Sequence, residues 1–150
     1  MAQLKEGDKA PDFRALDQDR KDISLKSFQG KKLILYFYPK DNTPGCTAEA
    51  CDLRDNYNQL MKLGYEVVGV SADNEASHKK FINKFELPFR LIADTDKIII
   101  KAYGAWGEKS MYGKKYEGIL RTTFLIDEQG MISKIFKKVD TKNHTKQIME

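Results

Sequence analysis

Residues 33–51 have the sequence LILYFYPKDNTPGCTAEAC. This stretch predicts the strand and the helix around which the rest of the fold is arranged. The first six residues are an unbroken apolar and aromatic run, which predicts a buried strand. Thr43 and Pro44 follow, and a hydroxyl residue before a proline is typical of a helix start, with Thr43 as the N-cap. We therefore expect a strand, a short loop and then a helix over 43–63, with Cys46 in its first turn.

The chain has two cysteines, Cys46 and Cys51. In a first helical turn, free backbone N–H groups and the positive end of the helix dipole favour an anion, so we expect the thiolate form of Cys46 to be favoured. Cys51 lies about a turn and a half further on, where the dipole contributes little. Cys46 is therefore the expected nucleophile.

Other uses of this pair fit the sequence less well. Tetrahedral zinc wants four ligands, and besides the cysteines the chain offers only His78 and His144, each far away along the sequence. A thioredoxin-type dithiol places its cysteines three apart, whereas these are five apart, which weakens but does not exclude a plain disulfide exchanger. A permanent disulfide needs oxidising surroundings, and residues 1–8 contain no apolar signal-peptide core. Two inert buried thiols would not account for a cysteine at a helix start.

The spacing of the cysteines also predicts a conformational change. Along an ideal helix, five residues rise about 7.5 Å and turn the side chains roughly 140° apart. A disulfide needs Cα atoms within about 7 Å and converging Cβ vectors. The two cysteines therefore cannot bond while both lie in one intact helix, and any reaction that joins them requires part of the helix to unwind.

The sequence around Cys46 resembles the active-site signature of the peroxiredoxins, which are thiol peroxidases on a thioredoxin-like fold. The pattern is Pro39-x-x-x-Thr43-x-x-Cys46, and Cys51 five residues later is similar to the bacterioferritin comigratory protein, or peroxiredoxin Q, group. The resemblance covers nearly the whole chain and includes the segments 7–13, 33–38 and 121–127.

The resemblance implies a role for each residue of the signature. Cys46 would be the peroxidatic cysteine, whose thiolate attacks a peroxide oxygen and becomes a sulfenic acid, and Cys51 the resolving cysteine, which then forms an intramolecular disulfide with it. Thr43 would hydrogen-bond the peroxide and Pro39 would shield the thiolate from water, while an N-cap and a strand terminator are the local interpretations of these two residues. Arg121 would stabilise the thiolate and polarise the peroxide.

The implied reaction reduces hydrogen peroxide and small organic hydroperoxides and requires no flavin, haem or metal. The implied reductant is thioredoxin, or sometimes glutaredoxin, which would attack the disulfide through a mixed disulfide. A monomer is implied, since both cysteines are in one chain. A general thiol-disulfide oxidoreductase and a non-enzymatic redox sensor remain alternatives.

The remaining sequence is compatible with a single thioredoxin-like domain over residues 1–150, an α/β fold whose central mixed sheet is flanked by helices. Periodicity predicts strands at 33–38, 66–71, 121–126 and 131–136, the last two as an antiparallel hairpin, and helices over 43–63 and 74–85.

Composition and charge argue against other classes of protein. The formal net charge of +4 comes from scattered lysines with acidic residues between them, which indicates a solvated surface and no nucleic-acid partner. The longest apolar run, residues 33–38, is far shorter than the ~20 residues of a membrane span, so we expect a soluble, cytoplasmic protein without a membrane partner. We expect His78 and His144 to be exposed, Glu49 to be solvated or paired on its helix, and residues 103–118 to be a connection.

Overall fold

The structure is a computed structural model that describes residues 3–150. Its elements in chain order are β1 (Arg14–Leu16), β2 (Asp22–Ser24), the 3₁₀ helix η1 (Leu25–Phe28), β3 (Lys32–Phe37), α1 (Pro44–Asp55), α2 (Tyr57–Lys62), β4 (Tyr65–Ser71), α3 (Glu75–Phe85), β5 (Arg90–Ala93), α4 (Ile98–Ala102), β6 (Trp106–Met111), β7 (Lys114–Ile119), β8 (Thr122–Ile126), β9 (Ile132–Phe136) and α5 (His144–Met149). Within the described range, no helix combines the length and apolar character that a membrane span requires.

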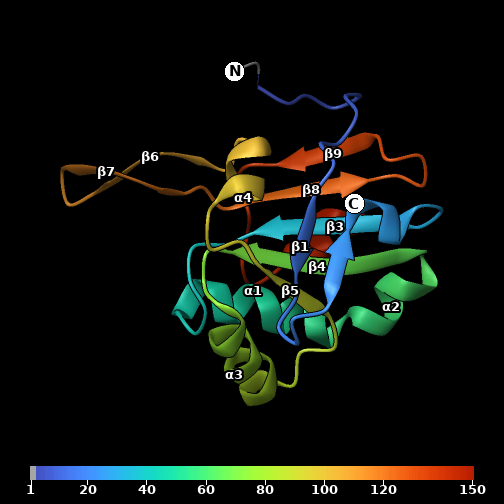
Figure 1. Ribbon diagram of the computed structural model, residues 1–150, viewed down its shortest axis with the longest axis horizontal. Coiled ribbons are helices and arrows are strands. Elements are labelled where there is room, and N and C mark those ends of the chain that lie inside the picture. The colour runs from blue at the N-terminus through green and yellow to red at the C-terminus, as the bar shows by residue number, and fades with distance from the viewer. Residues whose placement is uncertain (1–2) are drawn as a thin grey trace.

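The central sheet has five strands in the order β5-β4-β3-β8-β9 (Figure 1). β3, β4 and β5 run parallel, whereas β8 is antiparallel to β3 and β9 to β8. The predicted parallel strands followed by a hairpin are therefore confirmed, and the sheet is the mixed sheet of a thioredoxin-like fold.

Both faces of this sheet are covered, which explains why β3 reads as a continuous apolar run. On one face, α1 and α3 contribute buried side chains that include Leu53 and Phe81. On the other face, η1 and α4 contribute Phe28 and Ile100. From Leu33 to Phe37, successive residues of β3 alternate between these two clusters, so neither face of this part of the strand reaches water.

The pairing of β3 with β8 brings a distant arginine to the start of α1. Phe37, the last residue of β3, pairs with Thr122, the first residue of β8. Since the two strands are antiparallel, Arg121 lies just before β8 and beside the loop that leads from β3 into α1.

The helix predicted over 43–63 is divided at Asn56 into α1 and α2. The Asn56 side-chain amide donates to the Asp52 backbone carbonyl at 2.8 Å, so it competes for an acceptor that a continuous helix gives to a backbone N–H. Cys46 and Cys51 both remain within α1, and both thiols are free. The structure is thus the intact-helix state, in which the two thiols are not bonded.

Residues 103–118, expected as a connection, instead contain most of a β-hairpin that projects from the body of the protein (Figure 1). β6 and β7 meet at Tyr112 and Gly113, whose φ angles of 51° and 78° suit a two-residue hairpin turn. Seven of the twelve residues in the two strands are exposed, and Tyr112 in the turn is 98% exposed. The alternating pattern that would have predicted the strands is therefore absent.

The last helix, α5, is fixed to α1. The Thr145 backbone N–H, in the first turn of α5, donates to Asp52 Oδ2 on α1 at 2.7 Å. Ile148 of α5 joins the buried cluster on the same face of the sheet. The end of the chain therefore packs on the helix that carries both cysteines.

Candidate active site

Cys46 lies in the first turn of α1, as predicted from the sequence. Thr43 is the N-cap residue and Pro44 the first residue of the helix. The Cys46 side chain is buried, with 2% of its surface exposed. The free N–H groups of a helix start favour a negative charge at this position.

Arg121 contacts Cys46 and Glu49 with the two ends of its guanidinium group. Nη2 donates to Cys46 Sγ at 3.3 Å, and Nη1 donates to Glu49 Oε1 at 2.7 Å. Burial alone lowers the pKa of Arg121, but the negative charges of Cys46 and Glu49 outweigh burial and raise that pKa above its ordinary value. The structure therefore places a permanent positive charge against the sulfur of Cys46.

Gly45 makes this close approach possible. A Cβ atom at position 45 would lie 3.2 Å from Arg121 Nη2, which is tighter than ordinary van der Waals contact. A larger residue at this position would therefore require the Arg121 guanidinium to shift by a few tenths of an ångström. Gly45 thus has a steric role that the sequence alone did not reveal.

Glu49 is paired, one of the two outcomes expected for it, but it is completely buried rather than on the helix surface. It lies three residues after Cys46, and this spacing puts both side chains on one face of α1. Its second oxygen, Oε2, is buried without a hydrogen-bond partner among residues 3–150, and His144 Nε2 is 3.7 Å away. The helical spacing was the signal that could have identified Glu49.

The expectation that both histidines are exposed is wrong, because His78 and His144 are fully buried. His144 Nδ1 lies 2.8 Å from Gln147 Oε1, which only accepts, and Nε2 lies 2.8 Å from Thr123 Oγ1. Burial lowers the pKa of His144, so the ring is neutral, with its proton on Nδ1. No local pattern predicts this position, because the packing of α5 against α1 creates it.

Two effects oppose each other at Glu49. Burial favours the neutral acid, whereas the charge and the hydrogen bond of Arg121 favour the carboxylate. Burial is the larger effect and raises the pKa of Glu49 to about 7. Glu49 is therefore far more readily protonated than an exposed glutamate, although it is paired with Arg121.

The raised pKa of Glu49 predicts a pH-dependent stability. Because the folded chain binds this proton more tightly than the unfolded chain, the contribution is complete below the ordinary value of 4.5 and is lost as the pH rises through about 7. We expect the free energy of unfolding of the wild type, relative to Glu49→Gln, to fall by about 2 kcal/mol between about pH 5 and pH 7.5. Urea unfolding of both reduced proteins measures this difference, and a constant difference across the range would contradict the raised pKa.

The structure also locates the other residues of the predicted set. Thr43 occupies the N-cap position, but its hydroxyl donates to the Lys40 backbone carbonyl at 2.8 Å and makes no capping hydrogen bond. Pro39 is half-buried in the loop between β3 and α1. Cys51 is partly exposed further along α1, and the intact helix does not bring it to Cys46.

Comparisons with known proteins agree with this geometry. The AhpC/TSA family model matches residues 6–135. The putative peroxiredoxin bcp of Coxiella burnetii is 48% identical over 143 residues, or 95% of each chain. Peroxiredoxin Bcp of Escherichia coli K12 is 46% identical over 144 residues, which cover 96% of this chain and 92% of its own.

Solved structures show the same similarity. A mutant of Xylella fastidiosa PrxQ matches with a TM-score of 0.92 and 31% identity, over 99% of this chain and 95% of its own. Xanthomonas campestris bacterioferritin comigratory protein, whose structural study concerns its alkyl peroxide reduction activity, matches with a TM-score of 0.85 and 34% identity, over 91% and 87%. The chain therefore belongs to the AhpC/TSA family and, within it, to the peroxiredoxins of the bacterioferritin comigratory protein, or peroxiredoxin Q, group.

Proposed function

We propose that this chain is a thiol-dependent peroxidase that reduces hydrogen peroxide and organic hydroperoxides through Cys46. The observation that carries the proposal is the 3.3 Å hydrogen bond from Arg121 to Cys46 Sγ in the first turn of α1. A helix start and a guanidinium both favour a thiolate, which is the nucleophilic form of cysteine. The activity named for the Xanthomonas campestris relative supports organic hydroperoxides as substrates.

In the first step, the Cys46 thiolate attacks one oxygen of the peroxide and the O–O bond breaks. The sulfur is oxidised to a sulfenic acid, and the departing oxygen takes a proton and leaves as water or an alcohol. Arg121 Nη2, already at the sulfur, is positioned to stabilise the negative charge that moves onto the peroxide oxygens.

Thr43 and Pro39 complete the proposed peroxide site. The Thr43 hydroxyl hydrogen is committed to Lys40 O, so the hydroxyl lone pairs can accept a hydrogen bond from the peroxide O–H. Pro39 offers no N–H to water, and its half-buried ring limits solvent near the thiolate. Both residues lie in the segment that leads directly into the helix start that carries Cys46.

Cys51 is the proposed resolving cysteine. Its thiolate attacks the sulfur of the Cys46 sulfenic acid, which forms a disulfide and releases water. Since both cysteines lie in the intact α1, this step requires part of the helix to unwind. The partial exposure of Cys51 and the division of the helix at Asn56 support an unwinding confined to α1.

An external dithiol, thioredoxin or glutaredoxin, would then reduce the disulfide and restore the folded helix. We assign this cycle to one domain spanning residues 1–150, acting as a monomer in the cytoplasm, because both cysteines are in one chain and the disulfide is transient. No flavin, haem, metal, nucleic acid or membrane takes part in the proposed cycle.

The reaction of the reduced wild-type chain with peroxide tests this proposal. We expect a second-order rate constant at least ~10³-fold above that of free cysteine, because the charge of Arg121 is preorganised at the reacting sulfur. One equivalent of peroxide should convert the chain to an intramolecular disulfide, seen in the intact mass as the loss of two hydrogens. A rate no faster than that of free cysteine, together with rapid reduction of protein disulfides, would favour a general thiol-disulfide oxidoreductase instead.

A further inference from the structure

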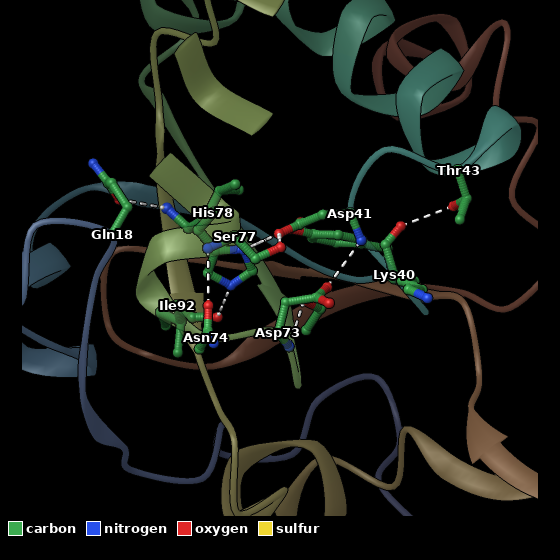
Figure 2. Close-up of polar contacts among 12 residues, drawn as sticks. Gln18, Lys40, Asp41, Thr43, Asp73, Asn74, Ser77, His78 and Ile92 are labelled. Atoms are coloured by element: carbon green, nitrogen blue, oxygen red, sulfur yellow. Dashed lines mark hydrogen bonds and ion pairs between the residues drawn. The ribbon is translucent and has the colours of Figure 1, made fainter. Parts of the chain in front are cut away.

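The loop between β3 and α1, residues 38–43, is held by hydrogen bonds with polar side chains that the proposed reaction does not use (Figure 2). They come from the loop itself, from the end of β4 and the segment that follows it, and from α3, and we call them the loop-anchor cluster: Tyr38, Asp41, Ser71, Asp73, Ser77 and His78. Four of the six side chains are buried, namely those of Tyr38, Asp41, Ser71 and His78. Buried polar groups need hydrogen-bond partners, so each contact constrains the loop.

One peptide group joins this cluster to Thr43. In the peptide between Lys40 and Asp41, the N–H donates to Asp73 Oδ2 at 2.8 Å, and the C=O accepts from Thr43 Oγ1 at 2.8 Å (Figure 2). A trans peptide is planar and rigid, and its N–H and C=O point in opposite directions. By accepting from the N–H, Asp73 fixes the orientation of this peptide plane. The C=O on the opposite side of the peptide then orients the Thr43 hydroxyl.

Asp73 is itself held in place by the end of β4. Ser71 Oγ donates to Asp73 Oδ2 at 2.7 Å, and the Asp73 backbone N–H lies 3.2 Å from the same Ser71 oxygen. Ser71 is completely buried in the central sheet. Asp73 Oδ2, which accepts from the Asp41 N–H, is therefore held in place through Ser71 by the central sheet.

The Asp41 side chain anchors the same loop to α3. Asp41 Oδ2 lies 2.7 Å from His78 Nδ1 and accepts from Ser77 Oγ at 2.8 Å, and Oδ1 accepts from Tyr38 Oη at 2.6 Å. On the other side of the ring, His78 Nε2 lies 2.9 Å from Ile92 O, which only accepts, so Nε2 carries a hydrogen. A second proton must then lie in the Asp41–His78 contact, and the pair anchors the loop as a unit without net charge.

We propose that Asp73 is a positioning residue for the Thr43 hydroxyl, acting through the Lys40–Asp41 peptide, and that the Asp41–His78 pair keeps this peptide in place. The inference rests on the proposed peroxidase function. The peptide directs the hydroxyl hydrogen of Thr43 toward Lys40 O and leaves its lone pairs for the peroxide. Displacement of the peptide would misplace this acceptor without disturbing the contact between Arg121 and Cys46.

The same residues raise the question of a metal ion, since ligand atoms of Asp41, Asp73 and His78 lie within 4.8 Å of one another. Donors from the protein already contact the oxygens concerned: Ser77 and His78 contact Asp41 Oδ2, and Ser71 and a backbone N–H contact Asp73 Oδ2. The cluster is therefore satisfied by hydrogen bonds, and we expect a chelator to leave the peroxide rate unchanged.

Asp73→Ala tests the proposed positioning. Removal of the acceptor should lower the rate constant of Cys46 with hydrogen peroxide by about 10- to 100-fold, because small misplacements of a substrate-binding group have effects of this size. Alkylation of Cys46 by iodoacetamide, which does not need the Thr43 hydroxyl, should change less than about twofold in the same protein. Asp73→Asn keeps an acceptor oxygen and should restore most of the peroxide rate. Both rates are measured by rapid mixing at one pH, with Cys51→Ser in every background so that only Cys46 reacts.

A double-mutant cycle with Thr43→Val separates positioning from general destabilisation. If Asp73 acts through the hydroxyl, Asp73→Ala should have no further effect on the peroxide rate once Thr43 is Val. The matched control is Asp127→Ala, which removes an acceptor of two backbone N–H groups in the β8–β9 turn and should lower stability without changing the peroxide rate.

Three outcomes would overturn the inference: an unchanged peroxide rate in Asp73→Ala, an equal fall in the alkylation rate, or an additive effect with Thr43→Val. A wild-type chain that reacts no faster than free cysteine would overturn the proposed function as well. Because the wild-type rate is measured first, failure of the inference alone is distinguishable from failure of the peroxidase proposal.

Discussion

Cys46→Ser is expected to lower the rate of peroxide consumption by about four orders of magnitude or more, the scale seen when an enzyme loses its nucleophile. A serine hydroxyl is not ionised near neutral pH, and its oxygen cannot replace the sulfur that accepts oxygen from the peroxide. Arg121 would still lie at the helix start, so the loss would measure the nucleophile and not the electrostatics of the site. The measurement is peroxide consumption in the presence of thioredoxin, thioredoxin reductase and NADPH.

The fold should survive this substitution, because serine is close in size to cysteine and its oxygen can accept from Arg121 Nη2. A thermal unfolding midpoint within a few degrees of the wild type would establish that the loss is chemical. Full peroxidase activity in Cys46→Ser would exclude Cys46 as the peroxidatic residue and remove the basis of the proposed function.

Cys51→Ser is expected to lower the steady-state rate of turnover with thioredoxin by about 100-fold or more. The rate of the first oxidation of Cys46 should stay within about twofold of the wild-type rate. Cys51 is partly exposed and takes no part in the hydrogen bonds that join Arg121 to Cys46 and Glu49, so its removal should not alter the first step. Without the second thiol, the sulfenic acid has no partner within the chain. Dimedone labelling followed by intact-mass measurement should detect that sulfenic acid after one equivalent of peroxide.

The wild type provides the comparison for this experiment, because it should form the disulfide and leave little sulfenic acid for dimedone to trap. An excess of peroxide should carry Cys51→Ser further, to the sulfinic acid, more readily than the wild type. Sustained thioredoxin-dependent turnover in Cys51→Ser would show that the reductant attacks the sulfenic acid directly and that Cys51 is not required.

The parts of the fold that depend on local patterns could be predicted from the sequence. The strand expected at 33–38 is β3 (Lys32–Phe37), and the hairpin expected from 121 to 136 is formed by β8 and β9. β3 and β8 are almost entirely buried, so their apolar runs carry the signal, whereas β9 is mostly half-buried and was predicted as the partner of β8 in the hairpin. The β6–β7 hairpin could not be predicted in this way. Most of its side chains face solvent, so its sequence lacks the alternation of apolar and polar residues that marks a half-buried strand.

The candidate site likewise contains some residues that the local sequence predicts and others that only tertiary contacts place. Pro39, Thr43 and Cys46 belong to one local motif. The position of Cys46 in the first helical turn follows from Thr43 and Pro44, which mark the start of the helix. The burial of Glu49, His78 and His144 comes instead from contacts between elements that are distant in the sequence. Because polar side chains are usually exposed and nothing in the local sequence marks the exceptions, the expectation that both histidines are exposed was wrong.

The contact between α5 and α1 has a consequence for the reduction potential of the cysteine pair. In the proposed cycle the disulfide forms only where α1 has unwound, so every contact that holds α1 folded, including that between Thr145 and Asp52, opposes the oxidised form. About 1.4 kcal/mol of such stabilisation corresponds to roughly 30 mV for a two-electron couple. The packing of the C-terminal helix would therefore make the disulfide a stronger oxidant and ease its reduction by an external dithiol.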